Sequence, residues 1–154
     1  MQKKEIITID SGTPEETQLF ATSIGKKLHG GECIELISDL GGGKTMFTRG
    51  LAAGAKSDDA VSSPTFTISK VYNTKSFDIH HFDFYRLPDA GLAAHELHDL
   101  VNDSEAVLVI EWGAAVQDVL PADRLTITFD KTSETTRRLT IQYPSSMKYL
   151  VENI

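Results

Sequence analysis

One stretch, residues 34–55, constrains this chain more than any other: IELISDLGGGKTMFTRGLAAGA. It combines an apolar strand, a glycine-rich turn and an amphipathic helix that begins at Lys44-Thr45. Glycines let successive backbone N–H groups turn toward an anion, and the helix N-terminus adds free N–H groups and the positive end of its dipole. This order of parts predicts a phosphate-binding loop.

Two side chains complete the predicted loop. In the pattern G-x-x-x-x-G-K-[ST], the lysine, here Lys44, contacts the β- and γ-phosphates, and the hydroxyl, here of Thr45, binds Mg²⁺. A plain turn with a solvated lysine is the simpler alternative, but the strand before the turn and the helix after it favour nucleotide binding. The positions expected to hold the nucleotide are Leu40, Gly41, Gly42, Gly43, Lys44, Thr45 and Met46.

Ser38 departs from this pattern, because it stands where the first glycine belongs. Serine tolerates a positive φ poorly. We therefore expect either an unstrained backbone at Ser38 or a slightly altered start of the loop.

Length and composition bound the remaining possibilities. We expect a single domain over residues 1–154, because this length suffices for one substantial core. The formal net charge of -7 argues against a broad nucleic-acid-binding face, and the tight basic pair Arg137-Arg138 is expected to be a solvated strand edge. The single cysteine, Cys33, is expected to be buried and inert. No signal-peptide pattern and no apolar run of transmembrane length occurs, which predicts a cytoplasmic protein.

Hydrophobic periodicity predicts alternating strands and helices. Strands are expected at residues 5–9, 34–37, 66–73, 77–85, 106–110, 124–129 and 138–143. Helices are expected at residues 14–28, 44–54 and 89–101, with a short helical turn at 116–120. The first helix has Thr13 as its N-cap, Pro14 at its first position and Glu16 closing a capping box. The pattern predicts an α/β fold with a three-layer P-loop NTPase-like sheet, mixed with antiparallel hairpins.

Carboxylates that could serve a nucleotide site follow two of the predicted strands. Glu111 ends the apolar run at 106–110, where ligands of parallel sheets bind, so we expect it to be a metal-site ligand. Asp83 lies among aromatic residues, on the strand face that carries His81. It could bind Mg²⁺ or orient the attacking water, or it could be a structural acid paired with His81 or Arg86.

Other candidate motifs are weaker. Ser63-Pro64-Thr65 could be a switch-like loop in which Thr65 senses the γ-phosphate, although a plain turn is the simpler interpretation. His95 and His98 have i, i+3 spacing, which is not the spacing of the zinc motif H-E-x-x-H. No G-x-S-x-G hydrolase element occurs.

Four segments, in this order, resemble the TsaE family, the small bacterial ATPases of tRNA threonylcarbamoyladenosine biosynthesis. They are SDLGGGKTMFTRGL at residues 38–51, SPTF at 63–66, HFDFYRL at 81–87 and IEW at 110–112. Spacing and overall length also match, so the resemblance covers nearly the whole chain.

The resemblance implies a P-loop ATPase domain that binds ATP with Mg²⁺ at Lys44 and Thr45. It further implies metal-binding and catalytic roles for Asp83 and Glu111. The remaining implied nucleotide-site residues are Trp112 and, in a switch-like segment, Thr65.

The family works with the threonylcarbamoyl transferase TsaD and its partner subunit TsaB. The resemblance therefore implies a role in forming N6-threonylcarbamoyladenosine at position 37 of tRNA, with ATP hydrolysis supporting turnover rather than performing the transfer. An acidic chain fits a protein partner better than tRNA itself.

The chain also departs from the family after Glu111. The family commonly continues with an acid and an arginine after the segment EWG, whereas this chain has Ala114-Ala115. An arginine near the nucleotide stabilises developing charge. We expect either weaker hydrolysis or a positive charge from Arg49, Arg86 or a partner.

Three alternative functions stay open. A small-molecule kinase could use the same loop, but no arginine-rich lid insertion is visible. A GTPase would need an N-K-x-D element, which the chain lacks. A non-catalytic nucleotide-responsive binding module would look the same in sequence as a slow, partner-dependent ATPase.

Overall fold

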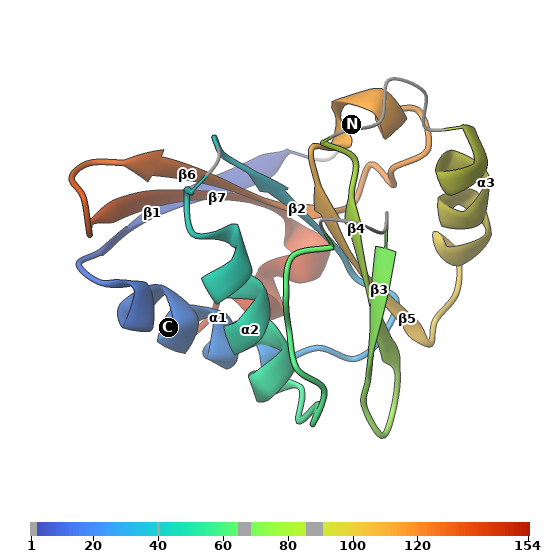
Figure 1. Ribbon diagram of the computed structural model, residues 1–154, viewed down its shortest axis with the longest axis horizontal. Coiled ribbons are helices and arrows are strands. Elements are labelled where there is room, and N and C mark those ends of the chain that lie inside the picture. Colours follow the sequence, from blue (N-terminus) through green and yellow to red (C-terminus); the bar gives the residue numbers. More distant parts are fainter. Residues whose placement is uncertain (1–2, 40, 65–68, 86–90) are drawn as a thin grey trace.

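A single seven-stranded mixed sheet forms the centre of the protein (Figure 1). The computed structural model describes residues 3–39, 41–64, 69–85 and 91–154. The strand order is β1-β7-β6-β2-β5-β4-β3. The bounds in chain order are β1 (Lys4–Ser11), β2 (Cys33–Ile37), β3 (Ser69–Asn73), β4 (Asp78–Asp83), β5 (Ala106–Glu111), β6 (Leu125–Lys131) and β7 (Arg137–Pro144).

Four adjacent strands, β6, β2, β5 and β4, run parallel, and antiparallel pairs flank them on both sides. The β6–β7 and β3–β4 pairs are the predicted hairpins, and β1 pairs antiparallel with β7. Every residue of β5 is buried, which explains the continuous apolar run at residues 106–110. Because the carboxyl ends of the parallel strands meet at one edge, the polar residues that follow them lie together there.

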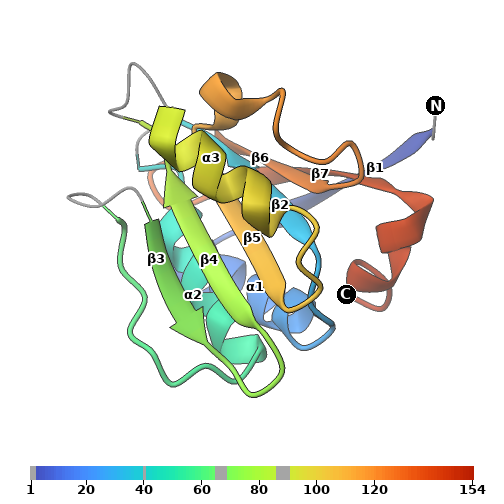
Figure 2. The same ribbon diagram turned by 90° about the vertical axis from the view of Figure 1, so that its right-hand side faces the viewer.

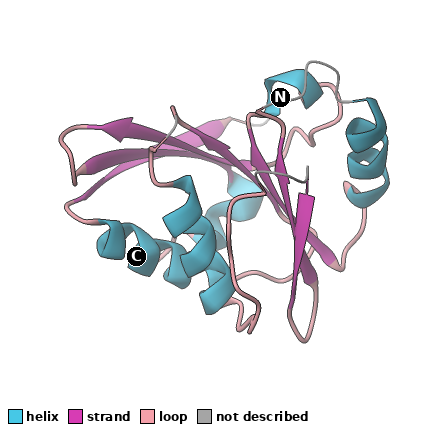
Figure 3. Cartoon of the chain, viewed as in Figure 1, coloured by secondary structure: helices cyan, strands magenta, loops and turns pink. Residues whose placement is uncertain are grey.

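Helices cover both faces of the sheet, which gives the three predicted layers (Figure 1, Figure 3). The helices α1 (Pro14–Gly25) and α2 (Lys44–Gly54) pack on one face in the larger core cluster. The helix α3 (Gly91–Leu100) and the 3-10 helix η1 (Gly113–Val116) pack on the other face, in the second cluster. Figure 2 shows α3 across β4 and β5, with α1 and α2 behind the sheet. A second 3-10 helix, η2 (Ser145–Leu150), closes the larger core.

Close packing of α1 on α2 fixes the helix that follows the glycine-rich loop. A Cβ at Gly50 would lie 2.1 Å from the Gln18 carbonyl oxygen, so only glycine permits this backbone approach. Phe47 anchors α2 further, because its ring lies 6.2 Å from Phe20 and 5.9 Å from Phe129 between centroids. The start of α2 is therefore held against the sheet.

The first helix begins at Pro14 as predicted, but its capping contacts and its end differ from the prediction. Thr13 accepts the Glu16 N–H at 3.1 Å as expected, but the Glu16 carboxylate accepts from the Gly12 N–H at 2.7 Å instead of closing the box on Thr13. The helix ends at Gly25, three residues earlier than predicted. The last turn tightens there through i→i−3 bonds, in which Leu28 N–H donates to the Gly25 carbonyl.

Cys33 is buried and free, as predicted. Burial raises the pKa of its thiol to about 12, with Glu35 adding to the shift and Arg124 opposing it. The thiolate is therefore scarce at neutral pH, and the residue serves as a small apolar side chain of the core.

Candidate nucleotide-binding site

The glycine-rich loop joins β2 to α2 and has the backbone conformation that its glycines permit. Gly41 and Gly43 have φ angles of 77° and 108°, in the left-handed region that favours glycine. The Gly42 N–H donates to the Asp39 carbonyl at 3.2 Å and closes a turn. Gly43 is the N-cap of α2, so the free N–H groups of the helix begin at Lys44. Leu40 lies outside the described residues.

The backbone at Ser38 explains why serine can replace the first glycine of the pattern. Its φ is not positive, so the backbone there is unstrained and serine is tolerated. Its Oγ donates to the Asp39 carbonyl at 2.8 Å, and a Cβ on Gly42 would lie only 2.3 Å from that Oγ. Ser38 therefore fills the space beside Gly42 that a side chain there would need.

Lys44 projects from the first position of α2 into a cluster of polar groups, with its side chain only 8% exposed. Its Nζ donates to the Ser38 carbonyl at 3.2 Å and lies 3.8 Å from Glu111 Oε1. Burial lowers the pKa of Lys44, and the nearby carboxylates of Glu111, Asp83 and Asp39 partly offset that effect. The ammonium therefore lies between the Ser38 carbonyl and the Glu111 carboxylate, beside the loop.

Glu111 and Asp83 meet because β5 and β4 are parallel neighbours whose last residues are register partners. Glu111 is buried, whereas Asp83 is half-buried. Burial raises the pKa of Asp83, the Glu111 charge adds to the rise, and the Tyr85 N–H, which donates to Asp83 Oδ1 at 2.9 Å, opposes it. His81 and Lys44 also oppose the rise.

Trp112 follows Glu111 in a left-handed backbone conformation, with φ at 55°. Such a conformation costs a bulky residue about 1–3 kcal/mol and is typical of functional sites. It places the indole ring 4.4 Å from Lys44 Nζ and 4.8 Å from the Tyr85 ring. The lysine therefore lies over an aromatic face, where a cation is attracted by the ring quadrupole.

A buried hydrogen-bond chain behind Glu111 was not predicted. His81 Nε2 bonds to Glu111 Oε2, and His81 Nδ1 lies 3.2 Å from the Tyr72 hydroxyl. That hydroxyl donates to the Ser62 carbonyl at 3.0 Å, and burial raises the pKa of Tyr72. The alternative in which His81 pairs with Asp83 is wrong, because the ring is already bonded to Glu111 and Tyr72. The other alternative partner, Arg86, lies outside the described residues.

Arg137 was expected on a solvated strand edge, and that prediction is wrong. Its guanidinium donates to the carbonyls of Gly41 and Gly42, at 3.2 Å in each case. Arg138 fits the prediction better, since it forms an exposed ion pair with Asp10 at 3.0 Å. The contact between Arg137 and the loop spans 95 residues of sequence, so no local pattern could indicate it.

The glycine-rich loop, Lys44, Asp83, Glu111 and Trp112 surround a pocket of about 370 Å³. Its described lining consists of Gly41, Gly42, Gly43, Lys44, Thr45, Met46, Ser63, Asp83, Glu111 and Trp112. Loop amides and Lys44 suit phosphates, and the hydroxyl of Thr45 with the two carboxylates is an oxygen donor set of the kind Mg²⁺ prefers. The residues present therefore fit Mg-ATP. Thr65 lies outside the described residues, but Ser63 of the same motif reaches the pocket.

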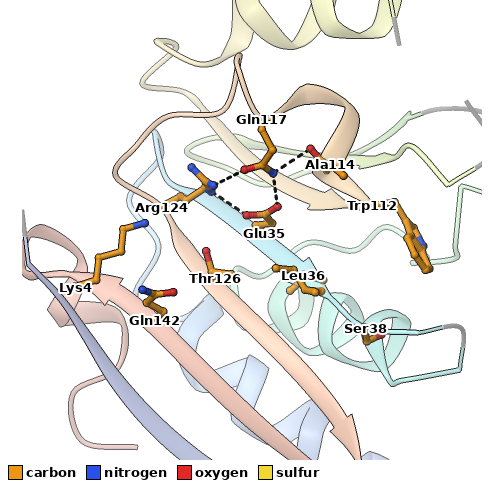
Figure 4. A pocket seen from close by; sticks show the side chains of 12 residues that line it. Lys4, Glu35, Leu36, Ser38, Trp112, Ala114, Gln117, Arg124, Thr126 and Gln142 are labelled. Atoms are coloured by element: carbon orange, nitrogen blue, oxygen red, sulfur yellow. Dashed lines mark hydrogen bonds and ion pairs between the residues drawn. The ribbon is translucent and has the colours of Figure 1, made fainter. Parts of the chain in front are cut away.

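A larger hollow of about 450 Å³ lies on the sheet face that carries η1 (Figure 4). Its floor is a closed polar network: Glu35 accepts from Arg124 Nε at 2.9 Å and from Gln117 Nε2 at 2.8 Å. Figure 4 shows these three side chains turned toward one another. Because their charges are already paired and loop amides are not among the described lining, the smaller pocket is the better nucleotide site despite its size.

Within the part of the chain that the structure describes, none of the helices combines the length and apolar character needed to cross a membrane. The same residues include no group of three or more His, Cys, Asp or Glu side chains arranged to hold a metal ion. A metal here would therefore depend on Asp83, Glu111, Thr45 and ligands from outside the protein, which suits Mg²⁺ bound with phosphates and water.

A family model and several curated proteins match most of this chain. A family model described as "Threonylcarbamoyl adenosine biosynthesis protein TsaE" matches residues 11–139. The tRNA threonylcarbamoyladenosine biosynthesis protein TsaE of Bacillus subtilis (strain 168) is 36% identical over 131 residues, covering 82% of this chain and 79% of that protein. The protein of the same name from Streptomyces coelicolor is 38% identical over 125 residues, covering 77% and 84%.

Structural comparison extends the similarity over nearly the whole chain. A crystal structure of YdiB from Bacillus subtilis matches with a TM-score of 0.77 and 26% sequence identity. The match covers 99% of this chain and 95% of that chain. The predicted α/β fold is therefore confirmed.

Proposed function

The chain belongs to the TsaE family of threonylcarbamoyl adenosine biosynthesis proteins, and from that premise we propose that it is a P-loop ATPase subunit. In this proposal it binds and hydrolyses Mg-ATP in the cytoplasm, in support of threonylcarbamoyladenosine formation at position 37 of tRNA. The observation that carries the proposal is the meeting of the glycine loop, Lys44, Asp83 and Glu111 around one pocket. The names of the relatives support the pathway.

In this proposal, the loop and Lys44 bind the phosphates. The amides at the start of α2 point their N–H groups at an anion, and the macrodipole adds to the attraction. Lys44 lines the pocket, with its Nζ 3.2 Å from the Ser38 carbonyl and 3.8 Å from Glu111, and the ammonium would move from these partners toward the phosphates. Mg²⁺, when bound with ATP, neutralises phosphate charge and orients the oxygens, and Thr45 and Glu111 would hold it.

Asp83 and Glu111 have different roles in the proposed hydrolysis. Both Glu111 oxygens face a cation or a donor, Lys44 on one side and His81 on the other, and these contacts hold the carboxylate in the orientation in which it would bind the metal. Among the described residues, Asp83 Oδ2 has no hydrogen-bond partner, so it can accept a proton or orient water. Burial raises the pKa of Asp83, which makes its carboxylate a stronger base than an exposed one.

The proposed partners are the threonylcarbamoyl transferase TsaD and its partner subunit TsaB. The formal net charge of -7 supports a protein partner over direct tRNA binding. ATP hydrolysis would support turnover of the transferase complex, because the described lining of the pocket consists of groups that suit phosphates and a metal ion.

Steady-state phosphate release tests this function. We expect slow turnover of Mg-ATP and not Mg-GTP by the protein alone, faster turnover with the transferase pair, and loss of turnover in Glu111→Gln. Turnover that requires a small acceptor and ignores the pair would instead indicate a kinase. Tight ATP binding without any turnover would leave a nucleotide-responsive binding module as the function.

A further inference from the structure

Arg137 connects two segments that the fold brings side by side, the phosphate loop and the turn between β6 and β7. Nε and Nη2 donate to the carbonyls of Gly42 and Gly41 in the loop, at 3.2 Å in each case. Nη1 donates at 2.9–3.3 Å to three carbonyls of the turn, those of Ser133, Glu134 and Thr136. One guanidinium thus holds two loops by their backbones.

The peptide geometry shows what this contact does to the loop. In a trans peptide the C=O and N–H point in opposite directions. When Arg137 holds the Gly41 and Gly42 carbonyls, the N–H groups of Gly42 and Gly43 must point away from it. Arg137 is not among the described residues that line the pocket, so it holds the loop from outside. The arginine therefore stabilises both peptide orientations: the Gly42 N–H donates to the Asp39 carbonyl and closes the turn, and the Gly43 N–H points away from Arg137.

The charge of Arg137 is also distinctive. All its hydrogen-bond acceptors are carbonyls, and within the described part of the chain it makes no ion pair. Its neighbour Arg138 is paired with the Asp10 carboxylate. In an acidic chain, the uncompensated charge of Arg137 contributes positive potential beside the loop.

We propose that Arg137 is a positioning residue that orders the phosphate loop before nucleotide binds. Glycines are costly to order because they lose the most conformational freedom, and here the loop has three in succession. A side chain that fixes two of their peptide planes removes part of that cost from the binding step. The identity of the ligand, Mg-ATP, rests on the proposed function. The ordering of the loop by Arg137 does not.

The test compares Arg137→Ala with Arg138→Ala, a matched control on the same strand. The first measurement is NMR amide hydrogen exchange at Gly42 in the nucleotide-free protein. We expect Arg137→Ala to raise the exchange rate about tenfold, because the turn loses its anchor, and Arg138→Ala to leave it unchanged. Circular dichroism confirms that both variants are folded.

The second measurement is Mg-ATP affinity and turnover. Arg137→Ala should raise the Kd and KM about tenfold while kcat stays within about twofold, since Arg137 touches no reacting atom. Arg137→Lys keeps the charge but lacks the planar fork, so it should recover part of the affinity without the exchange protection.

The outcomes separate the two proposals. If wild type fails to bind Mg-ATP, the proposed function is wrong, and the exchange data still decide the role of Arg137. Unchanged exchange at Gly42 in Arg137→Ala, or an equal effect of Arg138→Ala, would overturn the inference.

Discussion

His81 and Glu111 are joined by a buried hydrogen bond between Nε2 of the ring and Oε2 of the carboxylate. The His81 side chain is fully buried and that of Glu111 is 4% exposed. The bond holds the carboxylate so that its other oxygen faces Lys44 at 3.8 Å. The site therefore depends on a residue that does not itself line the described pocket.

The first prediction concerns this bond. His81→Ala should lower kcat for ATP hydrolysis about 10–100-fold, because the orientation of a metal ligand depends on its hydrogen-bond partner. Nucleotide affinity should change less, since the loop and Lys44 remain. Steady-state and binding assays below the melting temperature of the variant measure both effects.

Two further variants control that experiment. His80→Ala changes the adjacent residue, which faces the opposite side of β4, and should leave kcat unchanged. His81→Gln restores a nitrogen donor toward Glu111 and should recover part of the rate. Equal losses in the His80 and His81 variants would show that the bond has no specific role.

The second prediction concerns the stability cost of Asp83. Because its pKa is raised in the folded protein, mainly by burial, ionised Asp83 costs stability at pH 7. That cost disappears as the pH falls through the raised pKa, where the carboxyl is neutral. Asp83→Asn should therefore raise the Tm at pH 7, by about 2 °C, while abolishing turnover.

Thermal melts across pH test the sign. The advantage of Asp83→Asn should shrink as the pH falls through the raised pKa of Asp83, because the wild-type carboxyl then becomes neutral as well. Asp118→Asn, on an exposed position after η1, should leave the Tm unchanged. A lower Tm for Asp83→Asn at pH 7 would contradict the account.

The third prediction uses Trp112, which is the only tryptophan in the chain. Its ring lies 4.4 Å from Lys44 Nζ, so movement of the ammonium toward phosphates must alter the environment of the indole. Mg-ATP should change the tryptophan emission in a saturable way. The change should be absent in Lys44→Ala at the same concentrations, and a full response in that variant would place the nucleotide elsewhere.

The fourth prediction concerns the Thr45 hydroxyl. Thr45→Ala should bind ATP without metal as wild type does, but lose about tenfold in the affinity that Mg²⁺ adds. Thr45→Ser, which keeps the hydroxyl, should restore that gain. Titrations with and without Mg²⁺ measure the difference, and an unaltered Mg²⁺ dependence in Thr45→Ala would remove Thr45 from the metal site.

Much of the fold could be predicted from sequence because local patterns specify it. The apolar run before Glu111 predicted a buried strand, and Thr13-Pro14 predicted the start of α1; both were confirmed. The end of α1 was missed because Gly25 packs against the Leu51 carbonyl, a contact between helices that no local pattern contains.

The candidate site also has parts that local sequence indicates and parts that only the fold brings together. Loop glycines and Lys44 are recognisable because their chemistry requires consecutive residues. His81 and Glu111 are 30 residues apart, and Arg137 reaches the loop across 95 residues, so only the folded sheet brings them together. The left-handed backbone of Trp112 was equally invisible, because tryptophan rarely adopts it.

Calorimetric titration of Mg-ATP into wild type and Lys44→Ala tests the central claim most directly. The account predicts one saturable site in wild type and an affinity at least about tenfold weaker in the variant, because the phosphates lose the charge that the loop holds for them. Equal affinity in both proteins, or no binding to wild type, would contradict the assignment of this pocket as a nucleotide site.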